Sequence, residues 1–339
     1  MNMQNHDDLG IIKGFDFKEN EIANALKNNR LLQISVNISR KCNFHCSYCL
    51  MDGGKPRKNE LTNKEIKNAL LQAQNLGAKT WYIAGDGEPL LYKGIDNLID
   101  YANRIGMWVV LATNGELLSA KRAKELRKKN LSIITKFNAF DKRTFDFLVQ
   151  RKSAFVEFNG LFIPKGVASI IRAGFNQSAP TRAGIETVIT AKNIEEIPKI
   201  HKFALEHNLY ANIEMMLPIG RAEQYPELMP LNKDIEALYR KLDLENKKIS
   251  ITGKAGKKDI SHYHGIDCSA RIRYSLYTNS CGDVFLCFSQ HPSLSTGMNV
   301  RNFTLKEIIA KREFSNIPAG CACAYFSQEQ NKRREEKNE

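Results

Sequence analysis

The sequence lacks any apolar run of about 18 residues, the length that a helix needs to cross the hydrocarbon core of a bilayer. Its first ten residues are polar and lack the apolar stretch of a signal peptide. We therefore expect a cytoplasmic protein with no membrane partner. In that compartment the eight cysteines among its 339 residues are better explained as metal ligands or reactive thiols than as disulfides.

A basic stripe with interleaved aromatic residues, as found in proteins that bind single-stranded nucleic acid, is also absent. The 50 Lys and Arg residues outnumber the 37 Asp and Glu residues, which gives a formal net charge of +13. These basic residues are scattered, with local concentrations at residues 121–129 and 332–337. A solvated basic surface explains them better than a nucleic-acid site does, although such a surface attracts anionic partners.

What the sequence does contain is a regular alternation of apolar strands and amphipathic helices. Buried strands are predicted at residues 32–39, 80–84, 107–113, 131–137, 184–190 and 210–217. Helices are predicted at residues 62–76, where Thr62 with Glu65 three residues on forms a capping-box pattern, and at residues 95–105, 119–129, 142–149 and 194–207. Only residues 152–172 blur this pattern. Near-continuous apolar strands joined by helices predict an α/β fold with a parallel sheet. Six units are too few for a closed eight-fold barrel, so we expect a partial (β/α)6 barrel.

The composition changes after the sixth predicted strand, and this change sets the expected domain boundaries. The segment 223–258 is polar and rich in Lys and Gly, with a short helix expected at 232–243, and the segment 259–328 carries five of the eight cysteines. We expect the latter to be a small cysteine-rich domain that depends more on a metal centre than on an apolar core. The expected parts are an N-terminal extension (1–30), the barrel (31–222), a linker (223–258), the cysteine-rich domain (259–328) and a charged tail (329–339).

Three cysteines, Cys42, Cys46 and Cys49, follow the first predicted strand directly, with C-x3-C-x2-C spacing. On one tight loop, three thiolates at these offsets can each bind a different iron of a cubic four-iron cluster and leave the fourth iron open. Zinc would need a fourth ligand, and His45 lies inside the loop, where we expect it to point away from a shared tetrahedron. The spacing therefore predicts an iron–sulfur cluster whose open iron can bind further atoms.

With Tyr48 at its aromatic position, this motif resembles that of the radical S-adenosylmethionine (SAM) superfamily, and the resemblance covers the predicted β/α region. It implies that the open iron chelates the amino and carboxylate groups of SAM and that one electron from the cluster cleaves the sulfonium bond. The resulting 5′-deoxyadenosyl radical would then abstract hydrogen from a substrate. A partial (β/α)6 barrel and an electron donor such as a flavodoxin or ferredoxin are implied as well.

A second motif, Gly85-Asp86-Gly87-Glu88-Pro89, follows the second predicted strand. It resembles the G-G-E-P loop of the same superfamily, with Asp86 in place of the commoner second glycine, a change that we do not expect to alter its role. Glycines let the backbone approach a ligand closely. The resemblance implies that the loop carbonyls and Glu88 bind the ammonium group of SAM.

Further contacts to the cofactor are expected from side chains at the carboxyl ends of parallel strands. The candidates are Asn114, Lys136 and Asn138, for which ordinary turn or capping roles are equally consistent. After the sixth predicted strand, Leu217 and Arg221 resemble part of the segment that contacts adenine in the superfamily. Arg221 is alternatively a ligand for a substrate anion.

The later cysteines resemble a second signature of this superfamily. Cys268, Gly282 and Cys287 match C-x(9–15)-G-x4-C, which opens the twitch and SPASM extensions. The resemblance implies one auxiliary four-iron cluster, as in the twitch form. Its four ligands would be Cys268, Cys287, Cys321 and Cys323. A structural zinc ion remains an alternative for four cysteines.

Two residues are candidates for catalysis itself. Cys281 lies at the turn of a β-hairpin predicted over residues 274–286. It is either an ordinary turn thiol, a ligand in place of Cys323, or a donor of hydrogen to a substrate radical. Glu214 ends the sixth predicted strand, where a carboxylate among apolar residues needs a reason, either substrate binding or a salt bridge at the rim. Glu186 is a similar but weaker candidate.

These features favour a radical SAM oxidoreductase or epimerase. Its substrate would be a small polar metabolite, such as an aminocyclitol, sugar or nucleoside, that is oxidised, epimerised or rearranged. One alternative is maturation of a ribosomally made peptide, which is disfavoured because only roughly thirty residues precede the first predicted strand and leave no room for a peptide-recognition domain. Another is a non-catalytic iron–sulfur or zinc binding module, which would need neither residues 85–89 nor an open iron.

Overall fold

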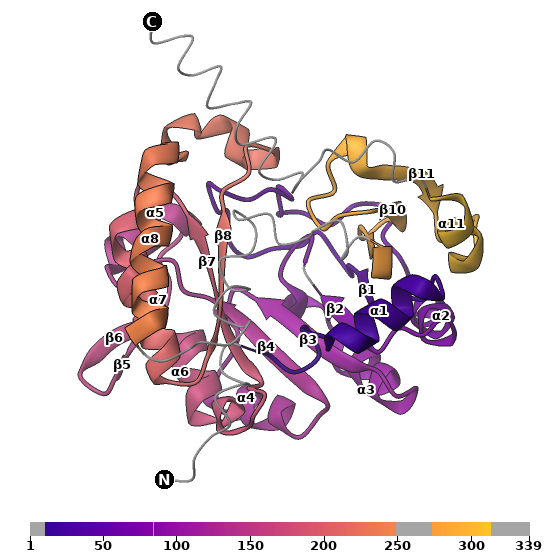
Figure 1. Cartoon of the computed structure of the whole chain (residues 1–339), viewed down its shortest axis with the longest axis horizontal. Coiled ribbons are helices and arrows are strands. Elements are labelled where there is room, and N and C mark those ends of the chain that lie inside the picture. The colour runs from indigo at the N-terminus through magenta and orange to yellow at the C-terminus, as the bar shows by residue number, and fades with distance from the viewer. Residues whose placement is uncertain (1–10, 84, 249–272, 313–339) are drawn as a thin grey trace, which may run out of the picture.

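The computed structural model describes residues 11–83, 85–248 and 273–312 (Figure 1). Its centre is a run of six parallel strands, paired in chain order and each connected to the next by helical crossovers. These strands are β1 (Gln33–Val36), β2 (Thr80–Ile83), β3 (Trp108–Thr113), β4 (Leu131–Lys136), β7 (Ala183–Ile189) and β8 (Tyr210–Met215). Five of the six lie within the predicted strands, and β7 begins one residue before its predicted strand. The α/β fold with the parallel sheet of a partial barrel is confirmed.

Eight α-helices of the described residues precede the C-terminal strands, and several of them pack against the strands of the sheet. They are α1 (Glu19–Lys27), α2 (Asn63–Asn75), α3 (Ile95–Arg104), α4 (Ala120–Arg127), α5 (Lys142–Val149), α6 (Lys165–Arg172), α7 (Ile197–Glu206) and α8 (Asn232–Lys248). In Figure 1, α7 and α8 lie outside β7 and β8, and α2 lies near β1. The predicted capping box is present at α2, where the Thr62 amide donates to the Glu65 carboxylate at 2.7 Å and the Glu65 amide donates to the Thr62 hydroxyl at 3.3 Å.

Successive residues of each strand point to opposite faces of the sheet, and both faces are buried. Trp81 and Ile83 of β2 face the helices and belong to the main apolar core. Tyr82 points to the inner side, where it packs in a smaller cluster with Ile12 and Val110. Burial on both faces explains why the strand sequences are almost continuously apolar.

Residues 152–172, where the sequence pattern blurs, contain a small hairpin followed by a helix. The hairpin pairs β5 (Phe155–Phe158) with β6 (Leu161–Pro164), and α6 follows at once. Asn159 and Gly160 form its turn, both with positive φ (49° and 78°). Asn-Gly is the preferred pair for such a two-residue turn. This local signal was therefore present in the sequence and identifies the hairpin.

The predicted hairpin over residues 274–286 is confirmed, since β9 (Ser275–Thr278) and β10 (Asp283–Phe285) are antiparallel. The sequence did not predict that β9 also pairs in parallel with β1, with Ser35 opposite Tyr277. With β11 (Ser295–Asn299), these strands extend the barrel sheet to nine strands. Figure 1 shows β10, β11 and α11 (Leu305–Lys311) on the side of the molecule where α2 lies. The division into domains at residues 222, 258 and 328 stays a prediction.

Among the described helices, none combines the length and the apolar character that crossing a membrane requires.

Candidate active site

A cavity of about 980 Å³, including its open mouth, lies at the carboxyl edge of the parallel strands. Its walls come from the loops after β1 and β2, from the ends of β3 and β4, and from β7 and β8. Residues predicted from sequence that line it are Cys42, Cys46, Tyr48, Cys49, Gly85, Gly87, Glu88, Asn114, Lys136, Glu214 and Leu217. The fold therefore brings together, in one cavity, motifs that are far apart in the sequence.

The cysteine loop is folded so that backbone amides point at two of its sulfur atoms. The Phe44 amide donates to Cys42 Sγ and the Gly53 amide donates to Cys49 Sγ, each at 3.4 Å. Hydrogen bonds of this kind stabilise thiolates that bind iron–sulfur clusters. In the described part of the chain, no three His, Cys, Asp or Glu side chains are grouped closely enough to hold one metal ion.

Two thiols of this loop, those of Cys42 and Cys46, are held in the neutral form unless a cation is present. Burial raises the pKa of the Cys42 thiol, and burial raises that of Cys46 to about 12. The nearby Cys49 raises both pKa values further. A bound metal centre supplies the positive charge that ionises such thiols. Without that charge they would be poor nucleophiles, so their burial favours a ligand role over thiol catalysis.

Residues 85–88 pack directly on the cysteine loop. The Glu88 amide donates to the Lys41 carbonyl at 2.8 Å. A Cβ atom at Gly87 would lie 2.3 Å from that same carbonyl oxygen, so only glycine allows this approach. Gly85 has φ +84°, a left-handed conformation that also favours glycine. Both glycines of the motif are thus required by the backbone geometry.

Glu88 is buried, and both of its carboxylate oxygens accept hydrogen bonds from the protein. The Thr113 hydroxyl and the Asn114 amide donate at 2.7 Å each, and the Leu90 amide donates at 2.9 Å. Burial raises the pKa of this carboxyl, although the hydrogen bonds oppose the shift. Glu88 thereby connects the loop after β2 to the end of β3. Pro89 does not line the cavity and begins the short 3-10 helix Pro89–Leu91 instead.

Three titratable side chains, from β4, β7 and β8, meet on the cavity wall. Lys136 Nζ lies 2.7 Å from the Glu186 carboxylate, and Glu214 lies beside Glu186. Burial lowers the pKa of Lys136, but the neighbouring carboxylates outweigh burial and raise it. Burial and then the charge of Glu186 raise the pKa of Glu214 to about 8. Glu214 is thus a neutral acid at pH 7, next to an ion pair.

Arg221 and Asn138 are buried behind the cavity wall rather than lining it. The Arg221 guanidinium donates to the carbonyls of Cys46 at 3.2 Å and Gly53 at 2.7 Å and to the Asp52 carboxylate at 2.7 Å. The Asn138 amide donates to the Tyr48 hydroxyl at 2.6 Å. In the structure both residues support the cysteine loop, a role that the sequence did not indicate.

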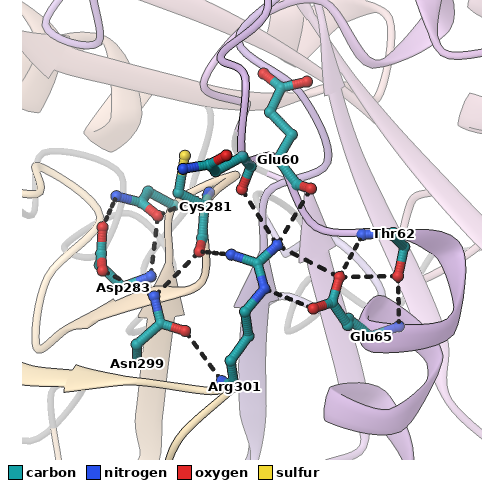
Figure 2. Close-up of polar contacts among 9 residues, drawn as sticks. Glu60, Thr62, Glu65, Cys281, Asp283, Asn299 and Arg301 are labelled. Carbon is teal, nitrogen blue, oxygen red and sulfur yellow. Dashed lines mark hydrogen bonds and ion pairs between the residues drawn. The ribbon is translucent and has the colours of Figure 1, made fainter.

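The second group of predicted ligands is described only in part. Cys268, Cys321 and Cys323 lie outside the described residues. Cys287 is half-buried and precedes Phe288, which lines the cavity. Cys281 lies at the hairpin turn and is not among the residues that line the cavity. Figure 2 shows Arg301 reaching the Cys281 carbonyl, to which it donates at 2.9 Å.

Residues 36–157 match the radical SAM superfamily, and this stretch contains both the cysteine loop and residues 85–89. This stretch of the chain is thus a radical SAM domain. Enzymes of this superfamily use a four-iron cluster and SAM. The cavity fits both groups, because its walls combine three cysteines with sulfur-directed amides and a glycine loop that approaches without side chains.

Individual radical SAM relatives differ in what they are named for. The chain is 23% identical over 272 residues to mycofactocin maturase MftC of Mycolicibacterium smegmatis. That match covers 76% of this chain and 64% of MftC. It is 32% identical over 157 residues to GTP 3′,8-cyclase of Tolumonas auensis, covering 44% of this chain and 43% of that protein. The chain thus spans less than two thirds of the length of these curated relatives.

The fold also resembles solved structures. Streptococcus suis SuiB, in a crystal structure with the precursor peptide SuiA, matches with a TM-score of 0.63 at 17% identity. The match covers 85% of this chain and 67% of that chain, so it includes most of the described strands and helices. At this level of identity the likeness concerns the fold alone.

The radical SAM motif contains one residue whose importance the sequence did not reveal. Asp86 is 2% exposed, and its carboxylate accepts hydrogen bonds from Ser280, in the turn after β9, and from Gln290, in the segment after β10. A glycine at this position would make none of these bonds. The only sequence signal was the departure from G-G-E-P itself.

Proposed function

We propose that this radical SAM enzyme modifies a peptide, with SAM bound between the cysteine loop and residues 85–88. The single observation that carries the proposal is the shared cavity, in which three cysteines, the glycine loop and the charged group of Lys136, Glu186 and Glu214 face one space. When bound, the cluster supplies the electron that cleaves SAM. The chain's own residues hold these groups, exclude water and orient the substrate.

Peptide maturation is supported over the small-metabolite alternative by the similar proteins. MftC is named a maturase, and SuiB was crystallised with its precursor peptide. The cavity is open and has apolar side chains on its walls, including Met51, Met215 and Phe288, against which a peptide side chain can pack. The net charge of +13 favours a peptide of acidic composition.

A small polar metabolite is the second candidate, and it has support of its own. GTP 3′,8-cyclase is named for a nucleotide substrate and is the more similar relative over the region that it matches. The ion pair of Lys136 and Glu186 also offers charged groups to a small polar molecule. In either case an electron donor such as a flavodoxin or ferredoxin would reduce the cluster.

Anaerobic reconstitution followed by reduction tests the enzyme class. We expect 5′-deoxyadenosine from the wild type and none from a variant with Ala at Cys42, Cys46 and Cys49. Wild-type protein that carries its iron and forms no 5′-deoxyadenosine would contradict radical SAM activity.

Hydrogen transfer distinguishes the two substrate classes. An extract of host cells grown in heavy water is separated by ultrafiltration into peptide and small-metabolite fractions, and each is added to the enzyme with unlabelled SAM. Deuterium in 5′-deoxyadenosine marks the fraction that holds the substrate. We expect it from the peptide fraction and expect protease treatment to abolish it. Transfer from the small-metabolite fraction would establish the second candidate instead.

An auxiliary cluster bound by Cys268, Cys287, Cys321 and Cys323 is part of the proposal. Replacing Cys42, Cys46 and Cys49 by Ala should then remove about half of the iron, because a second four-iron cluster remains. Replacing Cys287 by Ala should leave the first cluster and its response to SAM. Complete loss of iron in the first variant would contradict the auxiliary cluster.

A further inference from the structure

The buried carboxylate of Asp86 links the glycine loop to two separate parts of the C-terminal segment. The Ser280 amide, at the turn between β9 and β10, donates to Asp86 Oδ2 at 2.6 Å. The Gln290 side-chain amide, three residues after Cys287, donates to Oδ1 at 2.7 Å. Asn37 after β1 donates to Oδ1 at 2.8 Å. One side chain thus joins three stretches of chain that are far apart in the sequence.

Asp86 itself lines the cavity, so it is in contact with the space proposed for SAM. Its backbone is tightly held, because a Cβ atom on Gly53 of the cysteine loop would lie 3.0 Å from the Asp86 carbonyl oxygen. Asn37 holds the same loop from the other side by accepting a hydrogen bond from the Gly85 amide at 2.9 Å. A shift of residues 85–87 on ligand binding would therefore be transmitted to the Asp86 carboxylate.

The C-terminal residues that donate to Asp86 are themselves held by further contacts. The Ser280 carbonyl accepts from the Leu61 amide at 2.7 Å, and Phe288 beside Gln290 lines the cavity. Figure 2 shows Arg301 between the hairpin turn and the beginning of α2, where it donates to the Cys281 carbonyl and to Glu65. The turn is thus held between the glycine loop and α2 rather than projecting into solvent.

We propose that Asp86 is a positioning residue that couples ligand binding at the glycine loop to the docking of residues 279–290. Breaking any of the three hydrogen bonds to this carboxylate costs free energy, because a donor that moves away leaves the buried oxygen without its partner. Coupling between two sites is reciprocal, so SAM would stabilise the docked segment and the docked segment would strengthen SAM binding. The inference rests on SAM binding in the cavity, as in the proposed function.

Hydrogen exchange of residues 279–290 in the iron-loaded full chain, with and without SAM, tests the coupling. In the wild type we expect SAM to slow this exchange. Asp86→Gly restores the commoner glycine and removes the link, so SAM should no longer slow exchange there, and the Kd for SAM should rise about tenfold. Gln290→Asn shortens the side chain, so its amide no longer reaches Asp86, and asparagine suits the positive φ of that position. This variant should also abolish the effect of SAM on exchange and weaken SAM binding, without altering residues 85–89.

Asp283→Asn is the matched control. Its carboxylate accepts from Asn279 and Asn299 at 2.9 Å each, within the same strands, and makes no contact with the glycine loop. We expect this variant to speed exchange of the turn overall while SAM still slows it. Combining Asp86→Gly with Gln290→Asn should weaken SAM binding no more than Asp86→Gly alone, since both remove one link.

The outcomes separate the two proposals. Wild-type protein that binds SAM without slower exchange at residues 279–290 would overturn the coupling only. The same holds if SAM slows exchange equally in Asp86→Gly and the wild type, or if Asp283→Asn loses the response too. Iron-loaded wild type that binds no SAM would overturn both this inference and the proposed function.

Discussion

Lys136 and Glu186 form an ion pair on the cavity wall, with the ammonium nitrogen 2.7 Å from the carboxylate. The two residues are opposite each other on the neighbouring parallel strands β4 and β7. Glu214, on the next strand, adds a second carboxyl group that shares one cation with Glu186. Burial and then the charge of Glu186 raise the pKa of Glu214 to about 8, and the three side chains are balanced in charge while Glu214 keeps its proton.

The raised pKa of Glu214 predicts how stability depends on pH. In the unfolded chain this carboxyl titrates near 4.5, so its contribution to folding is fully present below that pH and is lost as pH rises through about 8. We expect the free energy of unfolding to fall by on the order of 2 kcal/mol between about pH 6 and pH 8. Glu214→Gln, which keeps the neutral form, should remove this fall.

Urea unfolding across that pH range measures the effect. Glu206→Gln is the matched control, because Glu206 is exposed on α7 and pairs only weakly with Lys202 at 3.8 Å. The Glu206→Gln variant should show the same fall of unfolding free energy with pH as the wild type. If Glu214→Gln has the same slope as the wild type, Glu214 is not protonated in the folded protein at pH 6.

Two glycines near the cysteine loop should differ sharply in their tolerance of alanine. A Cβ atom at Gly87 would lie 2.3 Å from the Lys41 carbonyl oxygen and 2.6 and 2.7 Å from the carbonyl carbon and oxygen of Arg40, all of them backbone atoms that cannot move aside easily. A Cβ atom at Gly54 meets nothing within 4 Å. Gly87→Ala should therefore displace residues 40–42 and reduce the iron bound by the first cluster, whereas Gly54→Ala should load normally. Equal iron content in the two variants would contradict the close packing of the two loops.

Arg221 supports the cysteine loop from behind, where it is 3% exposed. Arg221→Met keeps most of the side-chain volume but removes the bonds to Cys46, Gly53 and Asp52. We expect a loss of on the order of 3 kcal/mol in unfolding free energy, together with lower iron content. Arg240→Met on the exposed face of α8 is the control and should change neither quantity. Normal iron binding by Arg221→Met would favour the original expectation of a ligand contact over a supporting role.

The sequence was a good guide wherever local pattern determines structure. Strand periodicity located the six parallel strands, and Thr62 with Glu65 located the beginning of α2. The cysteine spacing and the glycine loop identified residues that indeed share one cavity. These features depend on neighbouring residues, so a single sequence contains them in full.

Long-range contacts could not be predicted in the same way. The pairing of β9 with β1 joins segments separated by roughly 240 residues, and nothing in either strand specifies its partner. Asp86 looked like a tolerated variant because its donors, Ser280 and Gln290, lie about 200 residues away. Arg221 looked like a ligand contact for the same reason, since only the fold shows that it is turned toward the cysteine loop.

Arg301 makes two of the capping boxes in the described residues, those of α2 and α11, behave differently. Thr62 with Glu65 and Thr304 with Glu307 have the same local geometry, but only Glu65 also accepts from Arg301, at 2.5 Å (Figure 2). The Arg301 hydrogen bond is the main reason why the pKa of Glu65 is lowered to about 2. The pKa of Glu307 is lowered by the hydrogen bonds of its own cap with Thr304 and, to a lesser extent, by the charge of Lys311.

Arg301→Ala should therefore raise the pKa of Glu65 toward its ordinary value while the pKa of Glu307 stays unchanged. A pKa lowered by folding contributes stability above the unfolded pKa and loses it as pH falls. The variant should thus be less stable than the wild type at neutral pH, by about 1 kcal/mol for a half-exposed pair, and the difference should shrink in acid. Carboxyl-carbon NMR titration of both glutamates makes the comparison within one sample. If the pKa of Glu65 stays at about 2 in the variant, the shift at Glu65 comes from its cap, and Arg301 does not hold the C-terminal strands to α2.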